Sequence, residues 1–258
     1  MIIIKKFKSY LDYCIIFCIL LIIFLVIILF MTKKQIKEGF FETHLENNKI
    51  VCFWTGDNNM SNNRLEAIEN LKQVSECNIV LIKKNDIESY ILKEHPLHPA
   101  FEYLSETHKA DYLRTYFMHF YGGGYSDIKK TTGSWKQSFE KLKNSDKWIC
   151  GYREVQYGVA YQPLSNEWEK FIGNGAYICK PQTPFTTEWY NEMIKLLDTK
   201  LEKLKEHPSS RPDNSTEKGT NYPIEWNEML GRIFHRVIYK YLDHISYDLS
   251  LPIFVNYR

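Results

Sequence analysis

The chain lacks the features that mark several protein classes. Its 33 Lys and Arg nearly balance 31 Asp and Glu, and a formal net charge of +2 gives no reason to expect nucleic-acid binding. No C-x-x-C spacing occurs, so a zinc site is not indicated. There is no internal repeat. With 258 residues, the chain is long enough for one α/β domain with a sizeable core, or at most two small ones.

The six cysteines do not define the cellular compartment. Cys14 and Cys18 lie inside a long apolar run and are expected to act there as small apolar residues. The others, each in or beside an apolar run, are expected to be free thiols: Cys52, Cys77, Cys150 and Cys179. Cys52 and Cys77 fall in strands that can be neighbours, so they form the one pair to check for a disulfide.

The segment from Tyr13 to Met31 contains 19 residues and no charged side chain. About 20 apolar residues span a bilayer as a helix. A cleaved signal peptide is the alternative, but its apolar core is shorter, about 7–15 residues, and no A-x-A-like cleavage site follows Met31. The sequence therefore predicts a tail over 1–12, an uncleaved transmembrane anchor over 13–31, a polar stalk over 32–48 and a folded domain over 49–258.

The charges that flank this segment hardly fix its orientation. Lys5, Lys6 and Lys8 precede it and Lys33, Lys34 and Lys37 follow it. The positive-inside rule therefore gives almost no indication of which end is cytoplasmic. N-glycosylation sequons begin at Asn59 and Asn214 and would suit a lumenal domain, but such triplets arise often by chance.

The folded part alternates strand and helix patterns, which indicates the α/β class with a mixed, mostly parallel sheet. Strands are predicted near 50–54, 78–82, 125–128, 147–151 and 176–179, and helices over 63–74, 86–93, 184–205 and 224–241. Thr183 is expected to cap the helix that begins at Pro184. The polar loop over 207–223 is expected to be a mobile flap over a site.

The stretch Lys109 to Lys130, KADYLRTYFMHFYGGGYSDIKK, is the most informative. Helical spacing predicts a buried stripe on its first half, made of Ala110, Leu113, Phe117 and Phe120.

Asp111 and Arg114 stand one turn apart on another face of this helix and are expected to touch. Gly122, Gly123 and Gly124 are expected to end the helix. A short strand follows, on which Tyr125, Asp127 and Lys129 alternate and project together.

This order of residues resembles the core signature of GT-A glycosyltransferases, in the group of Och1-like, capsular-polysaccharide and large-clostridial-toxin enzymes. Their pattern runs A/S-D-x-L-R, then Y-G-G-x-Y-x-D-x-D. Every element has a counterpart here except the last carboxylate, where Lys129 stands. The resemblance implies a GT-A-like nucleotide-sugar-binding fold, a short cytoplasmic tail, a single-pass type II anchor and a domain on the far side of the membrane. That location is Golgi- or ER-like in a eukaryote or virus; in a bacterium the anchor would lie in the inner membrane.

In this family the two carboxylates of the motif hold Mn²⁺ or Mg²⁺, which neutralises the diphosphate as it leaves. Asp127 takes the first position, and Lys129 takes the second. Two unit charges about 4 Å apart interact by about 4 kcal/mol at an effective dielectric constant near 20, so Lys129 would repel the metal. Either Asp127 alone anchors the metal, or Lys129 replaces part of its role as a phosphate-binding cation.

The resemblance also implies donor contacts by Asp111 and Arg114, and by Tyr125 near the nucleotide. Trp54 resembles an aromatic residue that stacks on the nucleotide base. A tryptophan packed in the core is an equally good interpretation. Asn174, within Ile172 to Tyr177, resembles the region that faces the transferred sugar. Trp226 and Glu228 resemble a segment that closes over the diphosphate, although core periodicity explains the surrounding helix adequately.

The sequence thus predicts a membrane-anchored glycosyltransferase of hexosyltransferase type. Its expected partners are a nucleotide-sugar donor and a saccharide or glycan acceptor, as in polysaccharide biosynthesis, and the resemblance implies retention of anomeric configuration. No strong nucleophile candidate appears, and no paired carboxylates indicate a hydrolase. The alternative is a catalytically inactive GT-A-like module that binds a glycan or a partner protein, for which Lys129 is the only support.

Overall fold

The computed structural model describes residues 20–25, 44–45, 47–209 and 221–256. The chain divides into two units, Met1–Glu42 and Thr43–Arg258, which are considered separately. In the first unit, residues 20–25 form an exposed apolar helical segment; the rest of the predicted tail, anchor and stalk, except the few residues after 43, lies outside the described residues. Among the helices that the structure does describe, none is long and apolar enough to cross a membrane.

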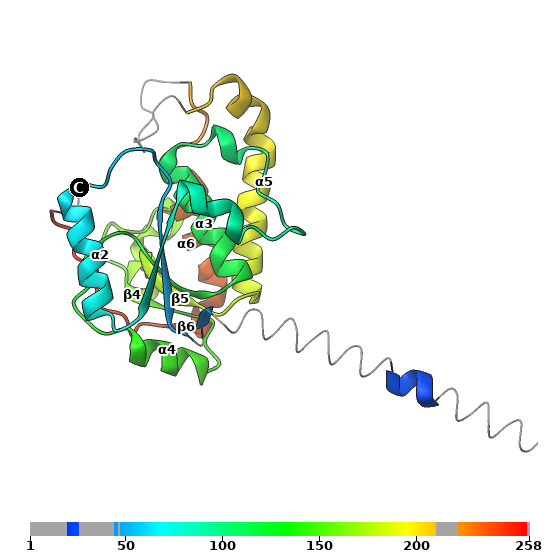
Figure 1. Cartoon of the computed structure of the whole chain (residues 1–258), viewed down its shortest axis with the longest axis vertical. Helices are drawn as coiled ribbons and strands as arrows, with labels where there is room; N and C mark the ends of the chain where they lie inside the picture. The colour runs from blue at the N-terminus through cyan, green and yellow to red at the C-terminus, as the bar shows by residue number, and fades with distance from the viewer. Residues whose placement is uncertain (1–19, 26–43, 46, 210–220, 257–258) are drawn as a thin grey trace, which may run out of the picture. The chain divides into compact units, whose positions relative to one another are not determined.

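The second unit is an α/β fold built on one mixed sheet (Figure 1). In the described part the sheet has six strands in the order β2-β1-β3-β5-β4-β6. Strand β1 is parallel to β2 and β3, β4 is parallel to β6, and β5 is antiparallel to both β3 and β4. The strands are β1 (Lys49–Trp54), β2 (Asn78–Lys83), β3 (Gly123–Ser126), β4 (Ile149–Arg153), β5 (Ile172–Cys179) and β6 (Ile245–Ser246).

Helices cover both faces of this sheet. The α-helices are α2 (Asn62–Val74), α3 (Glu106–Phe120), α4 (Lys136–Lys143), α5 (Pro184–Glu206) and α6 (Ile233–Ile238). Short 3-10 segments lie at Lys84–Tyr90, Phe101–Tyr103, Gln162–Lys170 and Tyr239–His244, and a π-helical turn lies at Glu228–Arg232. In Figure 1, α2 and α5 lie on opposite sides of the strands.

Successive side chains of a strand point to opposite faces of the sheet, so the core has two layers, one on each face. On one face, Ile50 of β1 and Ile178 of β5 pack with Phe139 of α4, while Cys52 packs with Leu71 of α2.

On the other face, the strands meet α3, α5 and α6 through aromatic rings. Phe53 contacts Phe117 of α3, and Tyr177 contacts Trp189 of α5 and Phe234 of α6. Large aromatic side chains therefore fill this layer.

Helix α3 is buried almost all round, so the prediction of a single buried stripe was wrong. Leu113 and Phe117 are buried as expected, but Tyr112, Tyr116 and Met118 are fully buried too. The reason is that the connection after β2 covers the remaining side of the helix: Tyr116 Oη donates to the carbonyl of His95, and the amide of Leu92 donates back to Tyr116. The buried residues of this helix include polar ones, such as Asp111, Arg114 and Thr115, which are paired inside the fold.

The break between α3 and β3 differs in detail from the prediction. Gly122 and Gly123 have positive φ, +62° and +82°, as a helix end of this kind requires. Gly124, however, belongs to the strand with Gly123, and β3 ends at Ser126 rather than at Ile128. Ser126 and Ala176 are the last paired residues of β3 and β5, so Asp127 and Lys129 lie in the turn that follows.

Of the other predictions, some are confirmed and some are corrected. Thr183 caps α5, its hydroxyl accepting from the amide of Thr186. The helix expected over 86–93 is a 3-10 segment that begins at Lys84, and the closing helix is split into a π turn, α6 and a 3-10 segment. Cys52 and Cys77 are free thiols, so the disulfide considered for them is not formed. Residues 210–220 of the predicted flap lie outside the described residues.

Gly122→Ala is expected to destabilise the fold. A Cβ at this position would lie 2.6 Å from Pro181 Cδ and 2.8 Å from the carbonyl oxygen of Cys179, and the left-handed backbone is itself costly for alanine. We expect a loss of about 2 kcal/mol or more in the free energy of unfolding, measured by urea denaturation. Gly133→Ala is the matched control, because its Cβ would meet only the Ser250 side chain. Equal stability of the two variants would contradict this account.

Candidate functional site

The candidate site lies at the carboxyl ends of the parallel strands β1 and β3. Val51 of β1 pairs with Tyr125 of β3, so the residues after Trp54 and after Ser126 reach the same edge of the sheet. In open α/β sheets, ligands bind outside this edge.

The Asp127 carboxylate is the centre of a cluster of polar groups. Tyr125 Oη donates a 2.6 Å hydrogen bond to Asp127 Oδ1, and a guanidinium nitrogen of Arg114 lies 3.3 Å from the same oxygen. Lys129 Nζ donates to the other oxygen, Oδ2. Tyr125, Asp127 and Lys129 therefore do project together, although only Tyr125 is in the strand.

Arg114 links this cluster to helix α3. Its guanidinium lies 3.1 Å from Asp111 Oδ1, so the predicted contact one helical turn apart is confirmed. It also donates a 3.0 Å hydrogen bond to the carbonyl of Asn174 and lies 4.4 Å from the centre of the Tyr125 ring. The Nε of Arg114 has no hydrogen-bond partner among the described residues. The side chain is 8% exposed, so this cation is buried just below the surface.

The surroundings of Asp111 and Asp127 shift the pKa values of these two carboxylates in opposite directions. Burial raises the pKa of Asp111 to about 7, against the opposing effect of Arg114. Burial acts in the same direction on Asp127, but Lys129 and Arg114 outweigh it and hold the pKa of Asp127 below its usual range. Burial keeps the pKa of Tyr125 well above its usual value, so its hydroxyl stays protonated and can donate to Asp127.

The turn that carries Asp127 and Lys129 is fixed by contacts from distant parts of the chain. From α2, Arg64 donates a 2.7 Å hydrogen bond to the carbonyl of Ile128, and Asn70 Oδ1 accepts from the amide of Thr131 at 2.8 Å. From the other side, the amide of Ile253 donates to the carbonyl of Lys130 at 2.9 Å. The site therefore rests on a rigid turn rather than on a free loop.

Sequence reasoning missed two aromatic residues of the site. Tyr152 of β4 accepts a 3.4 Å hydrogen bond from the amide of Gly175, and a Cβ added at Gly175 would lie 3.3 Å from both Tyr152 Oη and Asp127 Oδ2. The Lys129 ammonium lies 4.9 Å from the centre of the Phe254 ring. Neither residue falls in a recognisable motif, so only the packing of β4 and of the C-terminal segment could reveal them.

The remaining predicted residues lie outside the Asp127 cluster. Trp54 is partly buried, packs against the cluster around Cys52, and donates from Nε1 to the carbonyl of Asn58. Glu228 is engaged by Lys200 at 3.0 Å and by the amide of Glu225. Trp226 is 50% exposed. The structure therefore groups Asp111, Arg114, Tyr125, Asp127 and Lys129 with the backbone of Asn174, and leaves Trp54, Trp226 and Glu228 as separate predictions.

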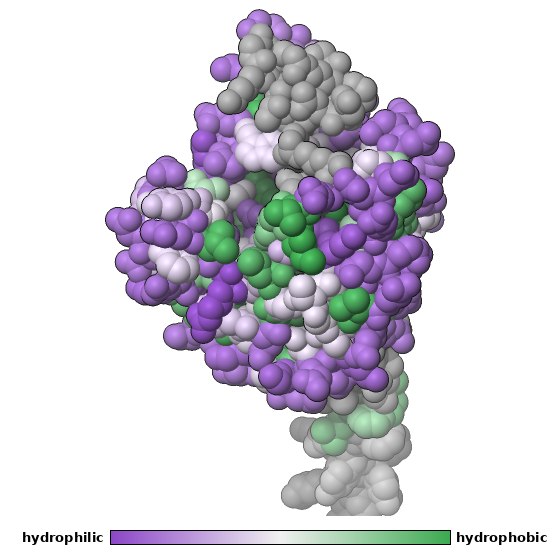
Figure 2. Space-filling view, turned by 90° about the vertical axis from the view of Figure 1, so that its left-hand side faces the viewer, coloured by the Kyte–Doolittle hydropathy of each residue, from purple (hydrophilic) through white to green (hydrophobic). Residues whose placement is uncertain are grey.

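One exposed apolar side chain, Phe254, lies beside this cluster. Figure 2 shows hydrophobic side chains near the centre of one face, with hydrophilic ones around them. Among the described residues, the exposed large apolar side chains of the second unit are Leu65, Val155, Tyr157, Trp226, Leu251, Phe254 and Val255. Of these, Phe254, 44% exposed, is the residue whose ring lies against Lys129.

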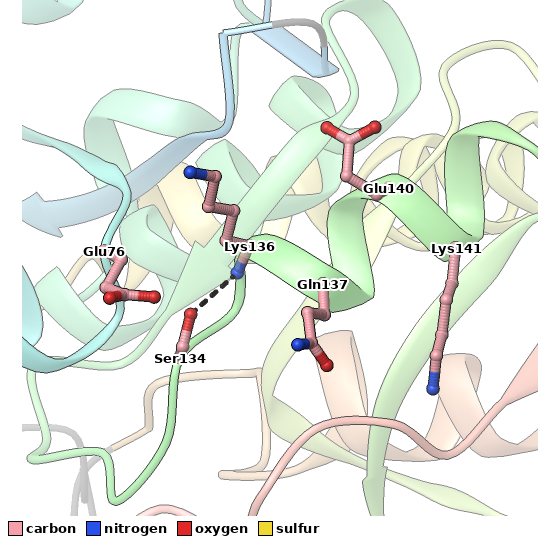
Figure 3. A pocket seen from close by; sticks show the side chains of 6 residues that line it. All are labelled: Glu76, Ser134, Lys136, Gln137, Glu140 and Lys141. Carbon is pink, nitrogen blue, oxygen red and sulfur yellow. Dashed lines mark hydrogen bonds between the residues drawn. The ribbon is translucent and has the colours of Figure 1, made fainter.

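A surface pocket lies away from these residues. It lies at the start of α4 and is lined by Glu76, Ser134, Lys136, Gln137, Glu140 and Lys141 (Figure 3). The side chains of Lys136 and Lys141 point in opposite directions in this view, so they do not converge on one anion. None of the predicted site residues lines this pocket.

Comparison with known proteins gives little independent guidance. No family model matches the sequence, and no curated protein matches it. A solved structure titled PaToxG Glycosyltransferase is similar at 15% sequence identity and a TM-score of 0.44, over 76% of this chain and 70% of that one. Similarity of this size does not establish a family, so the functional argument rests on the site itself.

The raised pKa of Asp111 makes the stability of the fold depend on pH. Its pKa is about 7 in the folded chain and ordinarily 3.8, so the folded state binds the proton more tightly than the unfolded state. Its contribution to stability is therefore complete below about pH 4 and is lost as the pH rises to about 7. We expect the wild type to lose stability relative to Asp111→Asn over this window, by up to about 1.4 kcal/mol per pH unit.

Urea denaturation at several pH values between about 4.5 and about 8 measures this difference. Asp146→Asn, at a carboxylate that is 79% exposed, is the matched control and should track the wild type. The opposite pH effect of Asp127 is present in every variant and is largely removed by the subtraction. A gap between wild type and Asp111→Asn that stays constant with pH would refute the assignment.

Proposed function

We propose that the chain is a glycosyltransferase that moves a sugar from a nucleotide-sugar donor to a saccharide or glycan acceptor. The observation that carries this proposal is the convergence of Asp111, Arg114, Tyr125, Asp127 and Lys129 at the carboxyl edge of the sheet. Asp111 and Arg114 come from α3, Tyr125 from β3, and Asp127 and Lys129 from the turn after β3. All of them except Lys129 follow the order of the glycosyltransferase signature.

The cluster suits the chemistry of glycosyl transfer. As the bond from the sugar to the diphosphate breaks, negative charge grows on the leaving group, and fixed positive groups stabilise it. Arg114 and Lys129 provide two such cations, held in place by Asp111 and Asp127. Asp127, with 23% of its side chain exposed, is the most open carboxylate of the cluster and can accept hydrogen bonds from hydroxyl groups of the donor.

Three finer features belong to this proposal as predictions from the sequence. They are a membrane anchor over 13–31, retention of anomeric configuration, and transfer of a hexose. The structure describes only residues 20–25 of the anchor, and no nucleophilic side chain is assigned to a covalent intermediate.

A second candidate function is a binding module without turnover. It is favoured by one observation, the ion pair between Lys129 and Asp127, which occupies the carboxylate that the related motif uses for its metal. Such a module would still bind a nucleotide sugar or a glycan at the same edge of the sheet.

Slow hydrolysis of a donor distinguishes the two. We expect the purified full-length chain to release the nucleoside diphosphate from at least one UDP- or GDP-sugar without an acceptor, and Asp127→Asn to reduce the rate about 100-fold or more, because Arg114 and Lys129 lose their common partner. Glu202→Gln, at an α5 carboxylate that is 78% exposed, should keep the wild-type rate. Binding of a nucleotide sugar by the folded chain without any release would favour the module. Absence of both would refute the glycosyltransferase proposal.

A further inference from the structure

We propose that this site binds the diphosphate of its donor without a divalent cation, and that Lys129 supplies the positive charge in the metal's place. The inference deepens the proposed function and depends on it.

The carboxylate oxygens of Asp127 are both engaged within the protein. Oδ1 accepts from Tyr125 at 2.6 Å and has Arg114 at 3.3 Å, while Oδ2 accepts from Lys129. Mn²⁺ and Mg²⁺ bind through open carboxylate oxygens. A metal at Asp127 would therefore have to share each oxygen with a donor that is already in place, Tyr125 at Oδ1 or Lys129 at Oδ2.

No second carboxylate is available to complete a metal site. Asp111 is 3% exposed and lies 3.1 Å from Arg114, which holds it as an ion-pair partner. Over the part of the chain that the structure describes, no group of three or more His, Cys, Asp or Glu side chains is arranged to hold a metal. The residues of this site thus do not fit the divalent ion that the resemblance implies.

The charges nearest to Asp127 also oppose a metal. Lys129 contacts one carboxylate oxygen and Arg114 lies 3.3 Å from the other. A divalent cation bound between them would be repelled by both, and burial weakens the screening of that repulsion.

Lys129 can supply the missing charge. Two carboxylates with one divalent ion have no net charge, and one carboxylate with one ammonium group has none either. Replacement of the second carboxylate by lysine therefore removes a negative charge and delivers a positive one in a single substitution. The electrostatic balance that a diphosphate meets at this edge is preserved.

The position of the ammonium group is fixed before any ligand binds. The Lys129 side chain is 9% exposed, bound to Asp127 on one side and covered by the Phe254 ring on another. A charge fixed in a partly water-excluded site stabilises an anion without reorganisation. The inference requires only this field at the diphosphate, so it does not depend on a direct contact with phosphate oxygens.

Nucleotide binding tests the inference without using turnover. Isothermal titration calorimetry of the full-length chain would use UDP, GDP, ADP, CDP and dTDP, each with EDTA and then with Mn²⁺. We expect the best nucleotide to bind with a Kd that differs by less than about threefold between the two conditions. Lys129→Met should weaken this binding about tenfold or more in both conditions, because the ammonium charge is lost.

Two further variants sharpen the test. Lys129→Asp recreates the second carboxylate of the motif, and we expect Mn²⁺ to strengthen its nucleotide binding about tenfold or more, which it does not do for the wild type. Lys130→Met is the matched control, because this neighbouring lysine forms only a partly exposed ion pair with Glu66 and should leave binding unchanged. Thermal melting of each variant shows whether it is folded.

The outcomes separate this inference from the function on which it rests. Wild-type binding that strengthens about tenfold or more with Mn²⁺ would overturn the inference and leave the glycosyltransferase proposal standing. Unchanged binding by a folded Lys129→Met variant would also overturn it. Absence of binding by the wild type to every nucleoside diphosphate, with and without Mn²⁺, would overturn both.

Discussion

The structure of this site depends on one carboxylate that is held from several sides. Asp127 contacts Tyr125 of β3, Arg114 of α3 and Lys129 of its own turn. Since burial alone would favour its neutral form, the carboxylate remains ionised only because these partners surround it. In return, Asp127 pairs with two cations that would otherwise repel each other. Removal of the Asp127 carboxylate takes a partner from both Arg114 and Lys129, and breaking a buried ion pair from one side is strongly destabilising.

The sheet places this cluster, and the chain fixes it by contacts remote in sequence. Strand β3 is only four residues long and contains two glycines, so it contributes little packing of its own. Gly124 leaves room for Ile50 and Phe139, whose side chains would lie 2.9 Å and 3.1 Å from an added Cβ. The turn after β3 is then held by α2 on one side and by the C-terminal segment on the other. Helix α3, β3, α2 and the last residues thus contribute to a single site.

Most helices and strands and the central residues of the cluster could be predicted from the sequence. The ends of several elements and the residues that join the cluster from distant parts of the chain could not. Local signals were sufficient for β1, α2, β2 and α5, because apolar periodicity and caps such as Thr183 act over a few residues. The burial of α3 on all sides could not be predicted, since it depends on the connection between β2 and α3, which has no regular pattern. The early end of β3 depends on its pairing with β5, and the split of the last helix depends on tertiary packing. Phe254 joins the site from over a hundred residues away without any motif.

The contact between Phe254 and Lys129 has a practical consequence. The last described residues lie directly over the charged cluster, with Ile253 bound to Lys130 and Phe254 against the Lys129 ammonium. The segment with Ile253 and Phe254 is therefore part of the site and not a neutral attachment point. An affinity tag or fusion partner joined there would pull on the residues that cover the cation, whereas an addition at the surface of α4 would not. For biochemical work on this protein, the choice of attachment point is therefore itself a perturbation of the Asp127 cluster.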